Sequence, residues 1–261
     1  MFPFFQIGPV EVYIFGLFLS LCFFVFLYML KKTSDKFHFN FNFFAKDIVW
    51  YFLSVFFFSR LFYVISNWGS LKFIDNPFAF FLMNDYNFSI FWAIFGFFII
   101  LYINVRIHKR KIEEFVDGVF LAFIIAASVG YIWALFGGQV YGLETSFGIE
   151  LSYTHPFTPV PYKVPVFPLP IIYSIMSFVI FSIFYTSHMF TEKRGLIGYL
   201  GFICFGAIVI IFDTFSGKFD TLQAILWIHF SQLFAFILIG LCMRRLYIIM
   251  KQDPQDAALQ K

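Results

Sequence analysis

The chain has 261 residues, of which 61% are hydrophobic and only 13% are charged, and its formal net charge at pH 7 is +3. A soluble domain of this length cannot bury so much apolar surface, so the composition excludes a soluble globular protein and indicates that a lipid bilayer is the solvent. The lysines and arginines lie in short segments between apolar runs and form no single basic patch, which argues against nucleic-acid binding and favours membrane topology.

Seven apolar segments reach the length of about 20 residues that a membrane-spanning helix needs. A segment inside a bilayer must be helical, because a lone strand would leave its backbone hydrogen-bonding groups unpaired. The sequence therefore predicts an all-α integral membrane protein, with a bundle of seven transmembrane helices over residues 1–250 and a disordered polar tail over residues 251–261. The predicted helices span residues 10–30, 46–66, 88–105, 115–136, 167–187, 195–213 and 222–243.

The positive charges of the predicted loops set the orientation of these helices. One set of loops, together with the tail, carries 14 of the 18 lysines and arginines, the opposite set carries 3, and Arg60 lies inside a helix. Because loops rich in lysine and arginine stay in the cytoplasm, the N-terminus is predicted outside and the C-terminus in the cytoplasm. The first apolar run is expected to remain in the membrane, since no positive charge precedes it and no small-residue cleavage site ends it.

Two predicted outer loops, residues 67–87 and 138–166, are long enough to be functional or disordered. The second loop carries four prolines in its second half, which exclude a helix there and favour extended structure. The three cysteines, Cys22, Cys204 and Cys242, lie far apart inside apolar runs. Neither a disulfide nor a metal site is therefore predicted, and no cofactor is expected.

The segment from Gly130 to Gly142 closes the fourth predicted helix and opens the longest loop. It contains four glycines, which allow a backbone or a ligand to approach where a side chain would block it. Gln139 adds an uncharged polar group at the point where the helix gives way to the loop. We expect ligand binding at this segment.

Four ionisable residues fall within or at the ends of the predicted helices, where a charge is costly unless it is paired. Arg60, Asp213 and His229, the last about two turns into its predicted helix, share a similar outer depth. Arg60 could there grip the phosphate of an anionic headgroup; alternatively, Arg60 and Asp213 only pair to hold helices together. Asp117 opens the fourth helix, where a carboxylate suits the helix dipole. His229 is either a hydrogen-bonded packing residue or a base.

A series of short motifs follows one order and spacing along nearly the whole chain. The segments are Phe5 to Val10, Phe15 to Leu17, Ser59 to Val64, Asn76-Pro77, Ser89 to Gly96, Gly130 to Gly142, Ser146 to Gly148, Arg194-Gly195, Phe205-Gly206, Asp213 and Ser231 to Leu233. In the order and spacing of these motifs, the chain resembles the prolipoprotein diacylglyceryl transferases of bacteria. The resemblance implies seven spanning helices in the bacterial cytoplasmic (inner) membrane, with the N-terminus outside. It also implies a reaction that moves diacylglycerol from phosphatidylglycerol onto a cysteine thiol of a lipoprotein precursor.

Several of the family's motif residues are replaced. The family's motif histidine falls on Phe91, its two essential arginines fall on Tyr131 and Val209, its motif glutamate on Gln139 and its early tyrosine on Phe15. Arg60, Gly130, Gly142 and, conservatively, Asp213 carry over. A phosphoester leaving group needs positive charge where negative charge develops, and the attacking thiol needs a proton acceptor. The catalytic residues therefore stay open, with Arg60 and His229 as candidates.

Three functional hypotheses follow. The first is a divergent transferase that binds phosphatidylglycerol or another anionic phospholipid together with prolipoprotein signal peptides. Its expected substrate-binding residues are Arg60, Gly130, Tyr131, Gln139, Gly142 and Asp213. The second is a catalytically inactive relative that binds lipid or lipoprotein precursor as a scaffold or chaperone. The third is a small transporter, against which the absence of an inverted repeat and the few intramembrane charges argue.

Overall fold

The computed structural model describes residues 4–7, 10–66, 90–149, 164–187, 193–218 and 228–251. These residues hold seven helices of 17 residues or more, which are α1 (Ile14–Phe37), α3 (Ile48–Ser66), α5 (Ile90–Ile107), α6 (Glu113–Gly137), α7 (Leu169–Ser187), α8 (Leu196–Phe212) and α10 (Phe230–Lys251). The short elements are α2 (Asn42–Ala45), the 3₁₀ turn η3 (Asp213–Phe215) and the strands β1 (Phe4–Ile7), β2 (Val10–Tyr13) and β3 (Glu144–Ile149).

Within the described residues, five helical stretches are long and apolar enough to cross a membrane: Ile48–Ile65, Glu113–Phe136, Leu169–Ser187, Leu196–Phe215 and Phe230–Lys251. They agree with the predicted helical membrane protein. Many large apolar side chains on these helices face outward, among them Trp50 at 64% exposed and Leu241 at 58% exposed. Such side chains are stable outside the core only where lipid replaces water.

The prediction that the first helix begins at residue 10 is wrong. Residues Val10–Tyr13 form strand β2, which pairs antiparallel with β1, and the helix begins only at Ile14. The alternation of β-branched or aromatic residues with Glu11 suits a strand pair better than a lipid-facing helix. The helix also continues past residue 30 to Phe37, because Thr33 is buried against α6 and its hydroxyl donates to the carbonyl oxygen of Gly118 at 3.3 Å.

The last helix also differs from its predicted bounds of 222–243. Helix α10 begins at Phe230 and continues to Lys251, whereas residues 219–227 lie outside the described part of the chain. Leu246 and Ile249 are buried in the core, and their packing extends the helix beyond the apolar run. Of the tail predicted to be disordered, Lys251 is helical, and residues 252–261 lie outside the described residues, as do residues 67–87 of the first outer loop.

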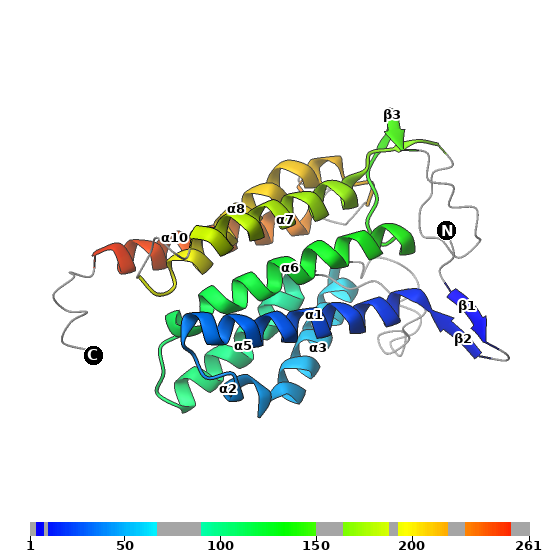
Figure 1. The fold of residues 1–261 in the computed structure, drawn as a ribbon. Coiled ribbons are helices and arrows are strands. Elements are labelled where there is room, and N and C mark those ends of the chain that lie inside the picture. The colour runs from blue at the N-terminus through cyan, green and yellow to red at the C-terminus, as the bar shows by residue number, and fades with distance from the viewer. Residues whose placement is uncertain are drawn as a thin grey trace.

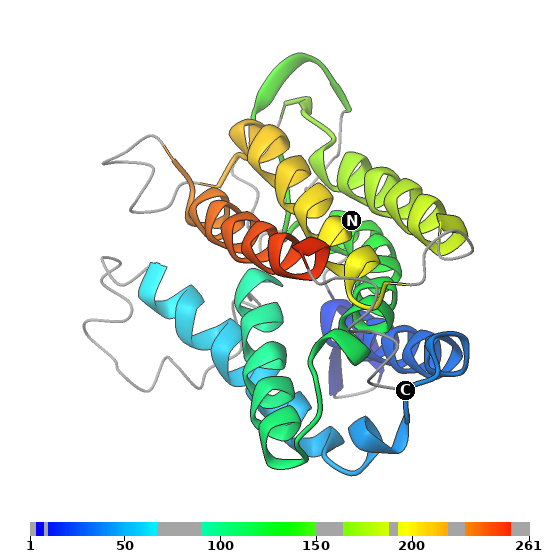
Figure 2. The same ribbon diagram turned by 90° about the vertical axis from the view of Figure 1, so that its left-hand side faces the viewer.

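Helix α6 is central to the bundle (Figures 1 and 2). Helices α1, α7 and α8 all pack on α6, whereas α10 packs on α8 and α3 packs on α5. Strands β1, β2 and β3 lie at one end of the bundle, here called the strand end, and α2 and the last turns of α10 lie at the other (Figure 1). We call the second end the basic end, because α1, α5 and α10 bring Lys36, Arg106 and Lys251 to it in their last turns.

The contacts of α6 with its neighbours depend on small residues. A side chain at Gly198 of α8 would lie 2.6 Å from the carbonyl oxygen of Val116, so glycine allows the two backbones to touch. On the other face, Ser128 of α6 and Ser174 of α7 each donate a hydrogen bond to the other's carbonyl oxygen, at 2.9 and 2.8 Å. Close approach and hydrogen bonds of this kind hold helices together where lipid removes the hydrophobic drive between them.

Asp117 caps a helix, although not the one predicted. Its carboxylate accepts hydrogen bonds at 2.6 Å from the backbone N–H groups of both Gly195 and Gly198, at the start of α8. Gly195 has a positive φ of 85°, and the first N–H groups of any helix lack partners inside that helix. The side chain, which is 4% exposed, therefore stabilises the N-terminus of α8 from the neighbouring helix α6.

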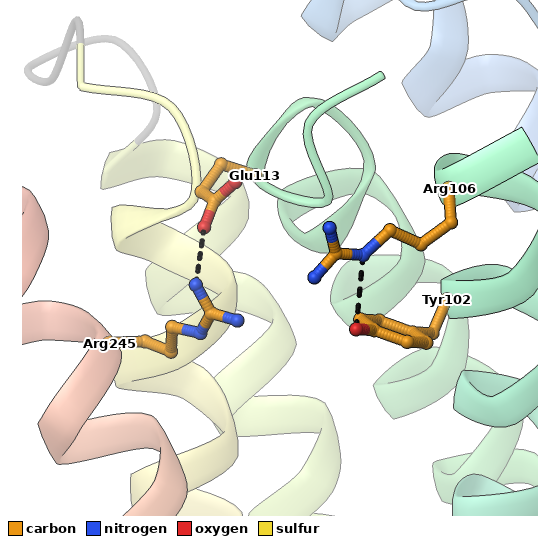
Figure 3. Close-up of polar contacts among 4 residues, drawn as sticks. All are labelled: Tyr102, Arg106, Glu113 and Arg245. Atoms are coloured by element: carbon orange, nitrogen blue, oxygen red, sulfur yellow. Dashed lines mark hydrogen bonds and ion pairs between the residues drawn. The ribbon is translucent and has the colours of Figure 1, made fainter. Parts of the chain in front are cut away.

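Ion pairs at the basic end are exposed and weak. Arg245 of α10 lies 3.6 Å from Glu113 of α6, while the Nε of Arg106 donates to the hydroxyl of Tyr102 at 3.0 Å (Figure 3). The Arg245 side chain is 49% exposed, and exposed pairs contribute about 0–1 kcal/mol. The Arg245–Glu113 pair therefore links the basic end of α10 only weakly to α6, and the Arg106–Tyr102 hydrogen bond lies within α5.

Candidate functional site

A cavity of about 560 Å³ lies between helices α1, α3, α5 and α6. It exists because α1 packs mainly on α6 and α3 mainly on α5, so that two helix pairs face each other across a gap. Its wall consists largely of phenylalanine and other apolar side chains, including Phe26 of α1, Phe56 of α3, Phe97 of α5 and Phe123 of α6. Pockets of about 300–1,000 Å³ with apolar walls are typical of small-molecule and cofactor sites.

The side of the cavity between α1 and α3 faces outward. Phe24 of α1 and Phe52 of α3 both line the cavity, yet they are 65% and 47% exposed. The rings of Phe23 and Phe52 meet edge to face, with centroids 5.6 Å apart. Aromatic contacts of this size contribute about 0.5–1.5 kcal/mol, so this wall is held weakly. An apolar chain from the surrounding lipid can therefore reach the cavity between these helices.

Polar groups gather where the cavity meets the strand end, at Gln139 and Lys218. Two distant segments pair here: the N–H of Leu143 donates to the carbonyl oxygen of Phe215 at 2.8 Å, and the N–H of Gly217 donates to that of Tyr141 at 3.0 Å. Gly142 lies opposite Ser216 in this antiparallel bridge. Lys218, which follows this pairing, lines the cavity together with Val140 and Gln139.

Gln139 follows the end of α6 directly. The helix ends at Gly138 with a φ of 68°, and the N–H of Gln139 donates back to the carbonyl oxygen of Ala134 at 3.1 Å. Glycine is favoured at this left-handed position. The side-chain Oε1 of Gln139 is buried and accepts no hydrogen bond from any described residue. A buried acceptor without a partner is costly, so this oxygen is ready to accept from a ligand.

Lys218 lies outside the helices and is half-buried. Burial lowers its pKa to about 8, and the nearby carboxylate of Asp213 opposes part of this shift. Asp213 accepts hydrogen bonds from the hydroxyls of Tyr173, at 3.3 Å, and Ser231. Tyr131 stacks on Tyr173 with ring centroids 4.8 Å apart. At neutral pH the strand end of the cavity therefore carries a cation that is only partly hydrated.

The predicted site residues separate into two groups. Gly130, Tyr131 and Gln139 line the cavity, and a Cβ added at Gly130 would lie 3.4 Å from the Sγ of Cys22, at ordinary contact distance. Arg60 is 2% exposed and is adjacent to Ser59, which lines the cavity; its guanidinium lies over the ring of Tyr63 at 5.3 Å. Arg60 itself is not part of the lining.

The remaining predicted residues, Gly142 and Asp213, do not line the cavity themselves but lie close to residues near its strand end. Gly142 lies against Phe167, whose backbone and Cβ occupy the space that a side chain at position 142 would need. Asp213 lies beside Tyr173 and Ser231 as described, outside the lining. Val209 and Phe205 are each 1% exposed and belong to the hydrophobic core, so position 209 faces packed side chains rather than the cavity.

The prediction that His229 lies about two turns inside the last helix is wrong. His229 immediately precedes α10, and its backbone N–H donates to the Oε1 of Gln232 at 3.0 Å. A glutamine at the third position of a helix can satisfy the N–H group of the residue that precedes the helix, which has no partner in the helix. Gln232 also donates to the carbonyl oxygen of Ile210 at 3.0 Å. This pair fixes the start of α10 on α8.

The sequence did not identify Lys218 as a site residue, because it was recognised only as one of the positive charges of the predicted outer loops. Its place on the cavity depends on pairing between residues 141–143 and 215–217, which no local pattern reveals. Among the described residues that line the cavity there is no histidine, aspartate or glutamate. The described lining can therefore hold an apolar body and an anionic or hydroxyl-bearing head, but it offers no carboxylate or imidazole as a base.

Comparison with known proteins gives one family. A family model described as prolipoprotein diacylglyceryl transferase matches residues 3–248, nearly the whole chain. No curated protein matches the chain significantly.

Proposed function

Because the chain belongs to the prolipoprotein diacylglyceryl transferase family, we propose that it takes phosphatidylglycerol into the cavity between α1, α3, α5 and α6 and transfers its diacylglyceryl group to the cysteine of a lipoprotein precursor. The observation that carries this proposal is the cavity itself, which is lined mainly by apolar side chains and has Gln139 and Lys218 at the strand end. An anionic lipid with long acyl chains has the same distribution of polarity.

The proposed setting is the bacterial cytoplasmic membrane, which the chain crosses seven times. The strand end then faces outward and the basic end faces the cytoplasm, since positively charged loops stay inside. In this orientation the polar end of the cavity lies at the level of the outer headgroups. The weakly held wall between α1 and α3 gives the donor lipid a route from the bilayer.

In the proposed reaction the thiol sulfur forms a thioether bond with the terminal glyceryl carbon of the donor. The bond between that carbon and the phosphate oxygen breaks, and glycerol phosphate leaves with the electron pair. Negative charge develops on the leaving group, so a cation near the phosphate lowers the barrier. The thiol proton needs an acceptor, and no carboxylate or imidazole of the described lining supplies one.

The candidate binding residues have different roles in this proposal. Gly130, Tyr131 and Gln139 contact the lipid, because they line the cavity. Gly142 and Asp213 lie outside the lining and hold the segments of the strand end in place. Arg60 adds positive potential from the turn that carries Ser59.

A second candidate function is a non-catalytic lipid-binding protein. One observation favours it: no carboxylate or imidazole lies among the described residues of the lining. Such a protein would hold a phospholipid or a lipoprotein precursor as a scaffold or chaperone and would leave both unchanged.

The decisive experiment uses the purified full chain in nanodiscs that contain phosphatidylglycerol, with a synthetic peptide that carries a lipoprotein-precursor cysteine. Mass spectrometry reads the peptide for a diacylglyceryl thioether adduct, and native mass spectrometry reads the protein for retained lipid. An adduct supports the transferase. Retained lipid without an adduct supports the binding protein, and the absence of both would show that the cavity does not hold lipid.

We expect the Ala93→Trp variant to lose phosphatidylglycerol binding by at least about tenfold while its helical content stays unchanged. Ala93 lies on α5 and lines the cavity, so an indole there occupies space that an acyl chain would need; about 1.4 kcal/mol of lost contact is tenfold in affinity. The matched control is Ala45→Trp, at an exposed position of α2. Equal lipid retention in both variants would place the lipid elsewhere.

A further inference from the structure

The charge of the cavity lining is confined to one residue. Lys218 is the only charged side chain among the described residues that line it. An ammonium group beside an apolar space loses hydration and gains stability from an anion that takes the place of water. The carboxylate of Asp213 acts on Lys218, and the phenols of Tyr131 and Tyr173 interact with that carboxylate.

Gln139 supplies the complementary group. Its buried Oε1 accepts no hydrogen bond from the described residues, and an oxygen of this kind accepts only from a hydroxyl or an N–H donor. The bridge between Gly142 and Ser216 joins the segments that carry Gln139 and Lys218, and both residues line the cavity. One donor and one acceptor therefore face the point at which the head of a lipid would lie.

Resting on the proposed function, we propose that Lys218 and Gln139 together form the headgroup site for an anionic phospholipid that carries a free glycerol hydroxyl. The ammonium of Lys218 pairs with the phosphate, and the Oε1 of Gln139 accepts a hydrogen bond from the glycerol. Arg60, which does not line the cavity, plays no direct part in phosphate binding. The same pair would recognise free glycerol phosphate, but the apolar cavity beneath it favours the intact lipid.

The binding experiment uses the full chain in detergent, titrated with short-chain phosphatidylglycerol, phosphatidylmethanol and phosphatidylcholine and, in a separate arm, with soluble glycerol phosphate. We expect Lys218→Met to weaken phosphatidylglycerol binding by about 10–100-fold, the range of a charge-assisted contact, and Lys218→Arg to restore it to within about threefold, since both side chains are cationic. The matched control is Lys193→Met, an exposed lysine at the basic end, which should bind as the wild type does.

The Gln139→Leu variant tests the second half of the site. It should lose about tenfold in affinity for phosphatidylglycerol but keep its affinity for phosphatidylmethanol, which has the phosphate and lacks the glycerol hydroxyls. Binding of glycerol phosphate as tight as that of the lipid would show that the cavity is not part of the site, and this would overturn the assignment to a lipid.

The pH dependence gives a third readout. Lys218 is protonated below its pKa of about 8 and loses its charge above it, whereas the phosphodiester stays ionised. The affinity of the wild type for phosphatidylglycerol should therefore be constant at low pH and should fall by about tenfold from pH 7 to pH 9. In Lys218→Arg it should stay level, because arginine remains charged.

The outcomes separate this inference from the function on which it rests. If the wild type binds none of the lipids, both the proposed function and the headgroup site are wrong. If the wild type binds phosphatidylglycerol and Lys218→Met binds it as tightly as Lys193→Met, the headgroup site is wrong and lipid binding stands. Loss of binding in Arg60→Met but not in Lys218→Met, with both variants folded by circular dichroism, would assign the phosphate to Arg60 instead.

Discussion

The Asp117→Ala variant is expected to lose about 3–5 kcal/mol of unfolding free energy, because hydrogen bonds to a charged group contribute about 1.5–3 kcal/mol each and their loss leaves buried donors unpaired. The carboxylate accepts from Gly195 and Gly198 at 2.6 Å and is 4% exposed. Water cannot replace the carboxylate as hydrogen-bond acceptor at this buried contact between α6 and α8. The N-terminus of α8 would therefore detach from α6.

Unfolding of the detergent-solubilised chain, followed by circular dichroism, measures this effect. Asp117→Asn keeps one acceptor oxygen and should lose roughly half as much as Asp117→Ala. Asp35→Asn, at an exposed position near the end of α1, removes the same charge without a cap and should change stability by less than about 0.5 kcal/mol. An Asp117→Ala variant as stable as this control would show that the cap contributes nothing.

The second large effect is expected at Gly142. The Gly142→Val variant should weaken phosphatidylglycerol binding on the order of 100-fold, because the strand end can no longer hold Lys218 and Gln139 together and both headgroup contacts are lost. The space that a side chain would need there is filled by the backbone of Phe167. The added side chain would push residues 141–143 away from their partners at 165–167 and 215–217.

Far-UV circular dichroism separates this local change from unfolding. The change is confined to the strand end, so the helical content of the protein should stay the same. The control is Gly240→Ala on α10, where nothing lies within 4 Å of the added carbon. It should bind normally and gain stability by up to about 1 kcal/mol from the better helix propensity of alanine. Normal lipid affinity in Gly142→Val would mean that this bridge does not position the site.

Helix positions could be predicted well wherever an apolar run coincides with a lipid-facing helix. The second, third and fifth predicted helices begin within two residues of Ile48, Ile90 and Leu169, because hydropathy and helix bounds share one cause there. The prediction failed at Ile14 and Phe230, where strand pairing and a side-chain cap, respectively, decide where the helix begins. A hydropathy profile reveals neither the strand pairing nor the side-chain cap.

The candidate site was predictable only in part. Gly130, Tyr131 and Gln139 could be found, because the end of one helix and its glycine-rich turn are local features of the chain, and all three line the cavity. Lys218 could not, because its place on the cavity comes from a bridge between Gly142 and Ser216, which are far apart in the sequence. Arg60 was a candidate to grip the phosphate, yet the cavity lining includes its neighbour Ser59 and not Arg60.

The amino-acid sequence by itself determined the solvent of this protein, its helical class and the family to which it belongs. These follow from composition, hydropathy and motif order, which are properties of segments of about 20 residues or less. Only the tertiary structure decided which polar groups meet: Asp117 with the start of α8, and Lys218 with Gln139 at the cavity. The physical reason is that a buried charge is stable only beside a partner, and that partner can come from any part of the chain.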